Sequence, residues 1–229
     1  MARRPCPAAL ALALAGALAC AAATAQTAVP AASEAERLVF VEPHLAQLDP
    51  PRTLRYRYRR EGGAEAALDD EAALAFSRTT AGGCCAVRGR YLSGAQAVDL
   101  PDVEQAQANP IVLYFLEQQV RELHRRTRGS PAHFRRRIRL ALADAASVSS
   151  STIRWGGREL PARTVRIAPF VDDPYRARFE SDALTEYSFV LSDAVPGGVY
   201  QLRAGLPGVG GASQKLTLAE PAARPSDKR

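Results

Sequence analysis

Eight arginines lie close together between residues 121 and 139, and their guanidinium groups are suited to binding anions. Only Glu117 and Glu122 lie nearby to offset the charge, each four residues before an arginine. The functional interpretation is a surface for phosphate or carboxylate groups at the junction of two helices. The simpler interpretation is a solvated polar face, since the whole chain uses Arg and almost no Lys. The eight are Arg121, Arg125, Arg126, Arg128, Arg135, Arg136, Arg137 and Arg139.

Large aromatic side chains are the second group that could serve a ligand. Tyr56, Tyr58 and Trp155, with Phe189 and Tyr200, fall on apolar positions of expected strands. Such residues belong more often to a core than to a cleft. If the sheet curves away from its helices, the same residues line an apolar pocket.

Residues that could support hydrolysis or metal binding are scattered. His124 and His133 lie on neighbouring expected helices, but no third ligand follows at a metal-site spacing. Asp172 and Asp173 precede a proline, which is typical of turn chemistry. A hydrolase would need His133, Asp172 and Ser192 to converge within about 3 Å of one another. The sequence lacks the G-x-S-x-G, Walker and H-E-x-x-H motifs, so we predict no cofactor and no metal site.

Four cysteines occur, and Cys84 and Cys85 are the pair that follows the N-terminal leader described below. Two buried thiols are the simpler interpretation of this pair. A disulfide between the adjacent residues is the alternative, since an oxidising compartment permits it. Their spacing is not the C-x-x-C of a redox or zinc site.

The elements that must position these residues begin with strands. From Arg52 to Arg59, apolar and arginine residues alternate, which is the period of a half-buried strand. Two further apolar runs, over residues 72–76 and 84–92, flank turn residues at 79–83. By composition the first run could form a strand or a helix, and the turn residues favour a strand, so we expect the two runs to pair as a hairpin.

The middle of the chain has helical periodicity. Asn109 and Pro110 form a good helix start, and Gly129 is expected to end that helix. Ser130 and Pro131 repeat the same start at once. So short a join predicts a helical hairpin or a sharp elbow.

After residue 150 the period returns to two. Residues 152–155 and 158–167 flank a Gly-Gly turn, and strands are expected at 187–191, 199–204 and 215–218. The sequence therefore predicts an α+β fold: a curved antiparallel sheet of about six to eight strands with one helical hairpin packed on it. That hairpin is expected within residues 109–146, after the third strand.

The first 25 residues have the pattern of a secretory signal peptide. Arg3 and Arg4 precede an apolar stretch, and residues 23–25 fit an A-x-A cleavage site. We therefore expect export to the bacterial periplasm. Lipidation at Cys20 is the alternative, although Ala17 stands where the processing box usually has Leu. No later stretch is apolar enough over about 20 residues to span a membrane.

The rest of the chain suits one domain. Residues 26–36 lack periodicity and are expected to be a flexible lead-in, residues 37–219 the domain, and residues 220–229 a disordered tail. Cleavage would lower the formal charge from +6 to +4, because Arg3 and Arg4 are the only charged residues removed. In this compartment a nucleic-acid partner is not expected.

Three phrases of the sequence resemble a group of uncharacterised secreted bacterial proteins: Asn109–Glu117, Phe134–Arg139 and Leu191–Gly198. The resemblance covers most of the mature chain and implies no activity. The order of a Tyr-rich opening strand, hairpins and a covering helix is also similar to the half-barrels of periplasmic lipoprotein carriers. That likeness implies an architecture only.

Together these features favour a non-enzymatic envelope protein that binds an amphiphilic or anionic ligand, or an envelope partner such as anionic lipid or an acidic protein. An assembly module acting through an exposed apolar patch near Tyr114 or Phe115 is the alternative, and an envelope hydrolase is third. The sequence leaves the oligomeric state open. The residues predicted to bind a ligand are Arg125, Arg128, Arg135, Arg136, Arg137, Tyr56, Tyr58 and Trp155.

Overall fold

The structure is a computed structural model that describes residues 31–63, 65–98, 100–208 and 211–220. The chain divides into two compact units, residues 1–31 and residues 32–229, and the second unit contains every element below. The expected signal peptide, residues 26–30 of the expected lead-in and nearly all of the expected tail lie outside the described residues.

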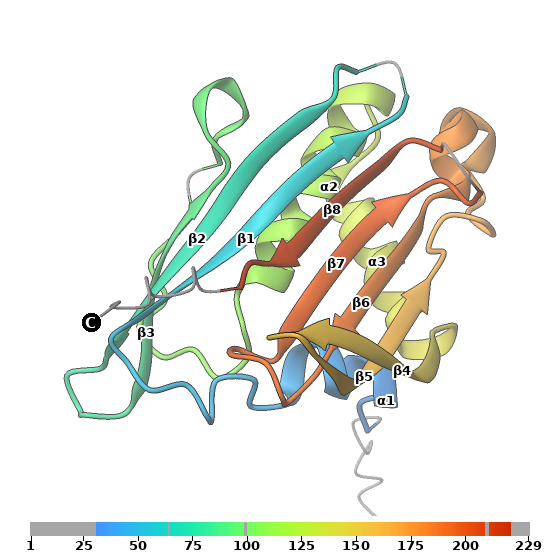
Figure 1. The fold of residues 1–229 in the computed structure, drawn as a ribbon. Helices are drawn as coiled ribbons and strands as arrows, with labels where there is room; N and C mark the ends of the chain where they lie inside the picture. The colour runs from blue at the N-terminus through green and yellow to red at the C-terminus, as the bar shows by residue number, and fades with distance from the viewer. Residues whose placement is uncertain (1–30, 64, 99, 209–210, 221–229) are drawn as a thin grey trace, which may run out of the picture. The chain divides into compact units, whose positions relative to one another are not determined.

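One open antiparallel sheet of eight strands organises the second unit (Figure 1). Its spatial order is β3-β2-β1-β8-β7-β6-β5-β4, so the last strand pairs with the first and joins the two halves of the sheet. The strands are β1 Arg52–Glu61, β2 Leu68–Arg78, β3 Cys84–Tyr91, β4 Ser147–Trp155, β5 Arg158–Ile167, β6 Glu186–Leu191, β7 Val199–Gly205 and β8 Ser213–Leu218.

The alternation in β1 sets which side chains face the core. Leu54, Tyr56 and Tyr58 are buried, whereas the intervening arginines are exposed. In β8 the buried positions are Gln214, Leu216 and Leu218. A one-residue shift in register would move these side chains to the opposite face, so the pattern fixes the pairing.

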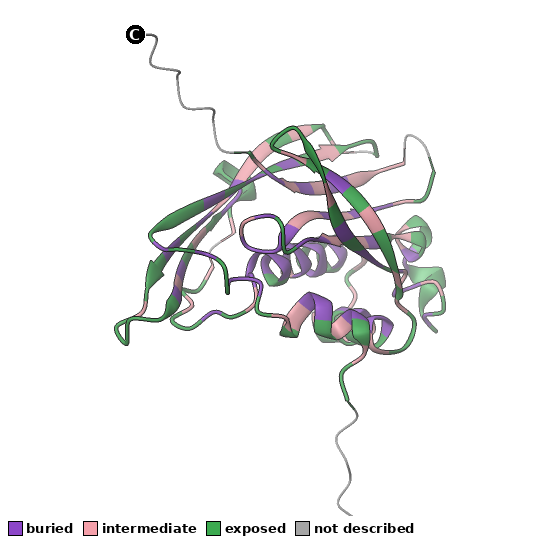
Figure 2. Cartoon of the chain, turned by 60° about the horizontal axis from the view of Figure 1, so that its bottom comes forward, coloured by how far each residue is buried: buried purple, intermediate pink, exposed green. Residues whose placement is uncertain are grey.

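Two helices, α2 Ile111–Thr127 and α3 Pro131–Asp144, lie against the inner face of the sheet (Figure 1). Figure 2 shows that buried residues of helices and strands gather between the two layers. Pro131 opens α3 as expected. The end of α2 differs from expectation, because Arg128 and not Gly129 takes the left-handed conformation. Gly129 is needed for another reason: a Cβ there would collide with the ring of Phe134.

The predicted fold class is confirmed, including the helical hairpin inserted after the third strand. The β4–β5 hairpin turns at Gly156 and Gly157, both with positive φ, as a two-residue turn requires. None of the helices in the described part of the chain is both long and apolar enough to cross a membrane.

Short helical turns are the elements that the sequence did not predict. Helix α1 Glu34–Glu36 continues into a wide turn over Arg37–Val41, where Leu38 and Val39 are buried. Ser33 and Glu36 form a capping box at its start. The expectation of a flexible lead-in through residue 36 is therefore corrected for residues 33–36. Two 3₁₀ turns, η3 Arg176–Arg178 and η4 Glu180–Leu184, precede β6.

Candidate functional site

A group of buried polar side chains crosses the interior between α2 and the sheet. Gln118 accepts a hydrogen bond from the Tyr91 hydroxyl at 2.6 Å, and donates to the Tyr58 hydroxyl at 3.3 Å and to Glu122 at 3.0 Å. Burial raises the pKa of Tyr58 to about 12, so its hydroxyl stays protonated at neutral pH. Each buried polar group in this part of the core therefore has a partner.

The same group continues toward the surface along β8. Gln214 donates to Glu122 and accepts a hydrogen bond from Gln119 at 2.6 Å. Residues 118, 119 and 122 share one side of α2 because of the helical period, and the strand alternation turns Gln214 toward them. We call Gln118, Gln119, Glu122 and Gln214, with the two tyrosine hydroxyls, the core polar network.

Arg126 links the core polar network to a cavity. It bonds Glu122 at 3.3 Å and holds both carboxylate oxygens of Asp182 at 3.0 Å. Burial disfavours the charge on Arg126, but the hydrogen bonds and charge of Asp182, with the charge of Glu122, outweigh it and raise the arginine pKa. The planar guanidinium fork suits this two-oxygen geometry.

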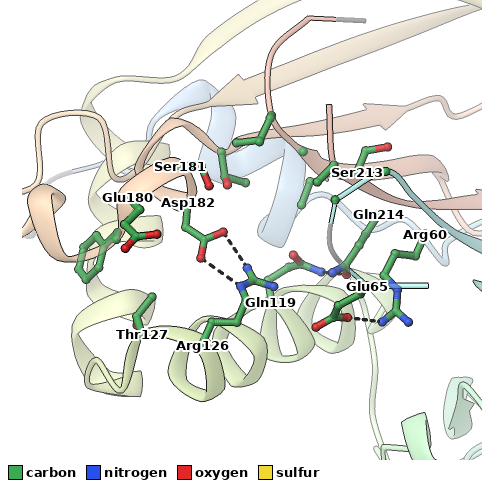
Figure 3. Close-up of a pocket in the computed structure, with 18 of the residues that line it drawn as sticks. Arg60, Glu65, Gln119, Arg126, Thr127, Glu180, Ser181, Asp182, Ser213 and Gln214 are labelled. Carbon is green, nitrogen blue, oxygen red and sulfur yellow. Dashed lines mark hydrogen bonds and ion pairs between the residues drawn. The ribbon is translucent and has the colours of Figure 1, made fainter. Parts of the chain in front are cut away.

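The cavity beside Arg126 has a volume of about 400 Å³, and we call it the α2 cavity (Figure 3). The end of β1, the β7–β8 connection, α2 and the η3–η4 turns all contribute to it. Its polar lining comprises Arg60, Glu65, Gln119, Arg126, Thr127, Arg178, Glu180, Ser181, Asp182, Thr185, Ser213 and Gln214. Phe179, Ala204, Leu206 and Ala212 give it an apolar part.

Some of the charged side chains that line the cavity form ion pairs, and others do not. Arg60 pairs with Glu65 Oε2 at 2.7 Å, and Arg125 pairs with Oε1 of the same carboxylate. The hydrogen bond from Arg125 is the main cause that lowers the pKa of Glu65. Arg178 forms no ion pair within the described part of the chain, although it lines the cavity. Arg178 is therefore a cation available to a ligand, although Glu180 also lines the cavity without an ion pair among the described residues.

Residues 168–185, which we call the 168–185 segment, close one side of the α2 cavity. Asp173 has a fully buried carboxylate that meets His133 Nε2 at 2.7 Å and Arg137 Nε at 3.1 Å. Phe170 and Phe179 pack against Phe134 of α3 with their rings edge to face. Since Phe179 also lines the cavity, these contacts hold that wall in place.

A second cavity, of about 600 Å³, lies at the opposite end of β1 beside His44, and we call it the His44 cavity. Asn109 organises this end: it donates to the Tyr56 hydroxyl at 2.9 Å and to the Gly197 carbonyl at 2.8 Å. A Cβ on Gly197, where φ is +75°, would collide with Asn109 and Leu54. The phrases that begin at Asn109 and end at Gly198 thus meet in space and have a structural role.

The arginines predicted to bind anions are mostly paired with acids. Arg125 bonds Glu65, Arg135 bonds Glu117 at 2.7 Å, and Arg137 bonds Asp173. Arg128 ends α2, and among the described residues neither Arg128 nor Arg136 forms an ion pair. Of the five, none lines either cavity. The structure thus supports the simpler interpretation of this cluster for three of its members.

The three aromatic residues predicted to bind a ligand are not brought together. Tyr56 and Tyr58 are 0% exposed, and their hydroxyls bond Asn109 and Gln118. Trp155 packs edge-on against Tyr200, with ring centroids 6.4 Å apart. Neither cavity is lined by any of the three, so neither cavity is the aromatic pocket considered for a curved sheet.

The residues considered for hydrolysis also stay apart. His133 contacts Asp173 and not Asp172, which is exposed. The Ser192 hydroxyl donates to the Pro161 carbonyl at 2.6 Å. His124 bonds the Gly129 carbonyl. Within the described ranges, no three His, Cys, Asp or Glu side chains are grouped so that they could hold a metal ion.

Cys84 and Cys85 differ in burial. Cys85 is fully buried and Cys84 is exposed at the start of β3, so the expectation of two buried thiols is wrong for Cys84. The structure joins the two sulfur atoms as a vicinal pair. Among the described residues, no titratable side chain bonds either sulfur atom, and Cys84 Sγ lies 3.7 Å from the Leu45 carbonyl.

Sequence reasoning missed the role of the core polar network and, apart from Arg126 in the arginine cluster, the residues that line the α2 cavity. Gln119, Glu122 and Gln214 look like ordinary surface residues, and residues 176–184 carry no periodic signal. The one available signal was the break in the strand pattern between Pro169 and Tyr187, a connection longer than hairpins usually need.

No protein-family model matches the chain, and no curated protein matches it either. Among solved structures, the crystal structure of the Mycobacterium tuberculosis lipoprotein LppX is similar, with a TM-score of 0.33 and 14% sequence identity. The match covers 76% of this chain and 90% of that one. It fits a distant architectural likeness, assigns no family and carries no argument about the site.

Proposed function

We propose that the protein is an exported, non-enzymatic binding protein of the bacterial envelope, and that the α2 cavity takes a small amphiphilic anion. Export rests on the leader pattern of residues 1–25, which lie outside the described residues. The cavity volume of about 400 Å³ is within the range of small-molecule sites.

The single observation that carries this proposal is the position of Arg178. It lines the α2 cavity without an acidic partner in the described part of the chain, while Arg60 and Arg126 are neutralised there by acids. A ligand anion would supply the missing partner through charge-assisted hydrogen bonds.

The rest of the lining suits an amphiphile. Gln119 and Gln214 present amides next to the cavity, and Phe179 and Leu206 present apolar surface. The described residues that line the cavity include no histidine and no cysteine, and Asp182 forms an ion pair with Arg126. This arrangement supports binding better than a nucleophile-and-base reaction, which needs both groups within reach of one another.

The test uses isothermal titration calorimetry of the mature protein with octyl phosphate as the anionic probe and octyl glucoside as the neutral one. We expect octyl phosphate to bind, and Arg178→Glu to weaken its binding at least about tenfold, since a charge-assisted hydrogen bond contributes about 1.5–3 kcal/mol. Octyl glucoside should bind much more weakly to the wild type.

Arg176→Glu is the matched control, because Arg176 lies in the same 3₁₀ turn but does not line the cavity. We expect it to change the affinity for octyl phosphate by less than about twofold, as a distant surface charge does at ordinary ionic strength. Equal losses in Arg178→Glu and Arg176→Glu, or no binding by the wild type, would contradict the proposed site.

The assembly hypothesis has less support. Tyr114 is 6% exposed and Phe115 is 0% exposed, so the apolar patch expected near them is not formed by these residues. Leu113, next to them, is exposed as a single side chain, which is common on protein surfaces.

A further inference from the structure

The outer face of the sheet, which points away from α2 and α3, carries a row of cations in register. Arg59 of β1 lies opposite Lys215 of β8, and Lys215 lies opposite Arg203 of β7. Arg203 lies opposite Ser188, which lies opposite Arg166 of β5. We call Arg59, Lys215, Arg203 and Arg166 the cationic row.

The residues next to the cationic row along each strand show that the row faces away from the core. The neighbours Tyr58, Gln214, Leu216, Leu202, Ala204, Val165 and Ile167 are all buried, and successive strand residues face opposite sides. The helices cover only the inner face (Figure 1). The row is therefore presented on the side of the sheet that carries no helix.

Like charges directly opposite one another destabilise an antiparallel sheet. Asp69 of β2, which pairs with Arg59 at 3.2 Å, offsets the repulsion between Arg59 and Lys215. Within the described residues, Lys215, Arg203 and Arg166 form no ion pair, and Arg203 bonds only the Leu206 carbonyl. A folding advantage therefore does not explain the row.

On the helical side of the molecule, Arg128 and Arg136 form no ion pair among the described residues, but other arginines are paired. There Arg125, Arg126, Arg135 and Arg137 each have an acidic partner. On the outer sheet face, Arg57 adds to the cationic row, as do Arg55 and Arg90, which share Glu71, and Arg88, which pairs with Asp102. The strand acids on that face are Glu61, Asp69, Glu71 and Glu186. The outer sheet face therefore has more cations than strand acids, and Arg57, Lys215, Arg203 and Arg166 form no ion pair within the described residues.

We propose that this outer face docks on an anionic phospholipid bilayer. Neighbouring strands are about 4.8 Å apart, so a row from β1 to β5 spreads its charge over roughly 20 Å. One small anion cannot meet charges so widely spaced, whereas a lipid surface offers many phosphates. This inference does not depend on the α2 cavity, which lies between α2 and the inner face.

The experiment is sedimentation of the protein with vesicles of phosphatidylcholine, with and without phosphatidylglycerol. The wild type should bind the phosphatidylglycerol vesicles at about 50 mM NaCl and be released at about 500 mM, because salt screens surface charge. The triple variant Arg57→Glu, Arg166→Glu and Arg203→Glu should partition at least about tenfold more weakly, since each basic residue near an anionic surface contributes to binding.

The charge-matched control changes three exposed arginines of the helical side to glutamate: Arg136, Arg139 and Arg176. Its vesicle binding should fall far less, and Arg178→Glu should keep wild-type vesicle binding whatever its effect on octyl phosphate. Arg203→Glu alone should raise the melting temperature, because Lys215 gains an opposite charge across the strands. If a sheet variant loses vesicle binding while its melting temperature is not lowered, unfolding is excluded as the cause of that loss.

Three results would overturn the proposal. The first is equal binding of the wild type to vesicles with and without phosphatidylglycerol, and the second is no binding to either. The third is loss of binding in the helical control to the same extent as in the sheet variant.

Discussion

At the scale of single residues, His44 shows how a buried titratable group serves the fold. The Asn109 backbone N–H donates to His44 Nδ1 at 3.2 Å, so Nε2 must carry the ring proton and donate it to the Leu38 carbonyl at 2.8 Å. This pairing requires the neutral imidazole. Burial lowers the pKa of His44 below its model-peptide value of 6.5, although the Leu38 carbonyl and the charges of Glu42 and Asp193 oppose the shift.

A consequence is that the folded protein should lose stability in mild acid. Because the pKa of His44 is lower in the native state, the unfolded chain binds a proton at this residue below about pH 6.5 while the native state does not. The free energy of unfolding therefore falls as the pH drops through that value. Urea unfolding at pH 7 and pH 5 should show this decrease. His44→Gln should remove much of it, and an unchanged pH dependence in that variant would contradict the assignment.

Residue-level reasoning from the sequence succeeded for apolar positions and failed for polar ones. The alternation around Tyr56 and Tyr58 correctly placed both on a buried face. The same alternation also indicated a possible ligand site. A pattern of apolar residues cannot show that a helix packs against Tyr56 and Tyr58 in place of a ligand. Gln118 and Gln119 are buried polar residues, and a polarity pattern treats such residues as exposed.

At the scale of elements, the 168–185 segment depends on one buried carboxylate. Asp173 accepts hydrogen bonds from His133 and the Tyr175 backbone N–H and forms an ion pair with Arg137, and it thereby joins the segment to α3. Because this segment forms a wall of the α2 cavity, its attachment also determines the shape of the proposed site.

Replacing Asp173 by alanine should cost about 3–5 kcal/mol of unfolding free energy, since it leaves a partly buried cation without its partner. Asp172→Ala is the matched control: its side chain is exposed, and the expected change is within about 0.5 kcal/mol. Urea denaturation of both variants measures the difference. Equal stability of the two would show that the segment is held by its aromatic contacts alone.

The long elements were predictable, and the short ones were not. Strands such as β1 and helices such as α2 carry their period over many residues and are bounded by Gly, Pro and Asn, so their positions follow from the sequence. Helix α1 and the η3–η4 turns are too short to show a period. They are stabilised because Leu38, Phe170 and Phe179 pack in the hydrophobic core. A local sequence pattern does not show such tertiary contacts.

At the scale of the whole second unit, the two faces of the sheet differ in their chemical properties. Its inner face holds α2, the core polar network and the α2 cavity, whereas its outer face carries the cationic row. The α+β class could be predicted from the order of strands and helices. The site could not, because it combines β1, β8, α2 and the 168–185 segment, which are far apart in the chain.

The central claim, that the α2 cavity binds a small amphiphilic anion, is tested most directly by native mass spectrometry of the protein purified from the bacterial envelope. The account predicts an added mass on the wild type that solvent extraction removes. The same mass should be present on Arg176→Glu and absent from Arg178→Glu. A bare protein mass in every sample, or an added mass that Arg178→Glu retains, would contradict it.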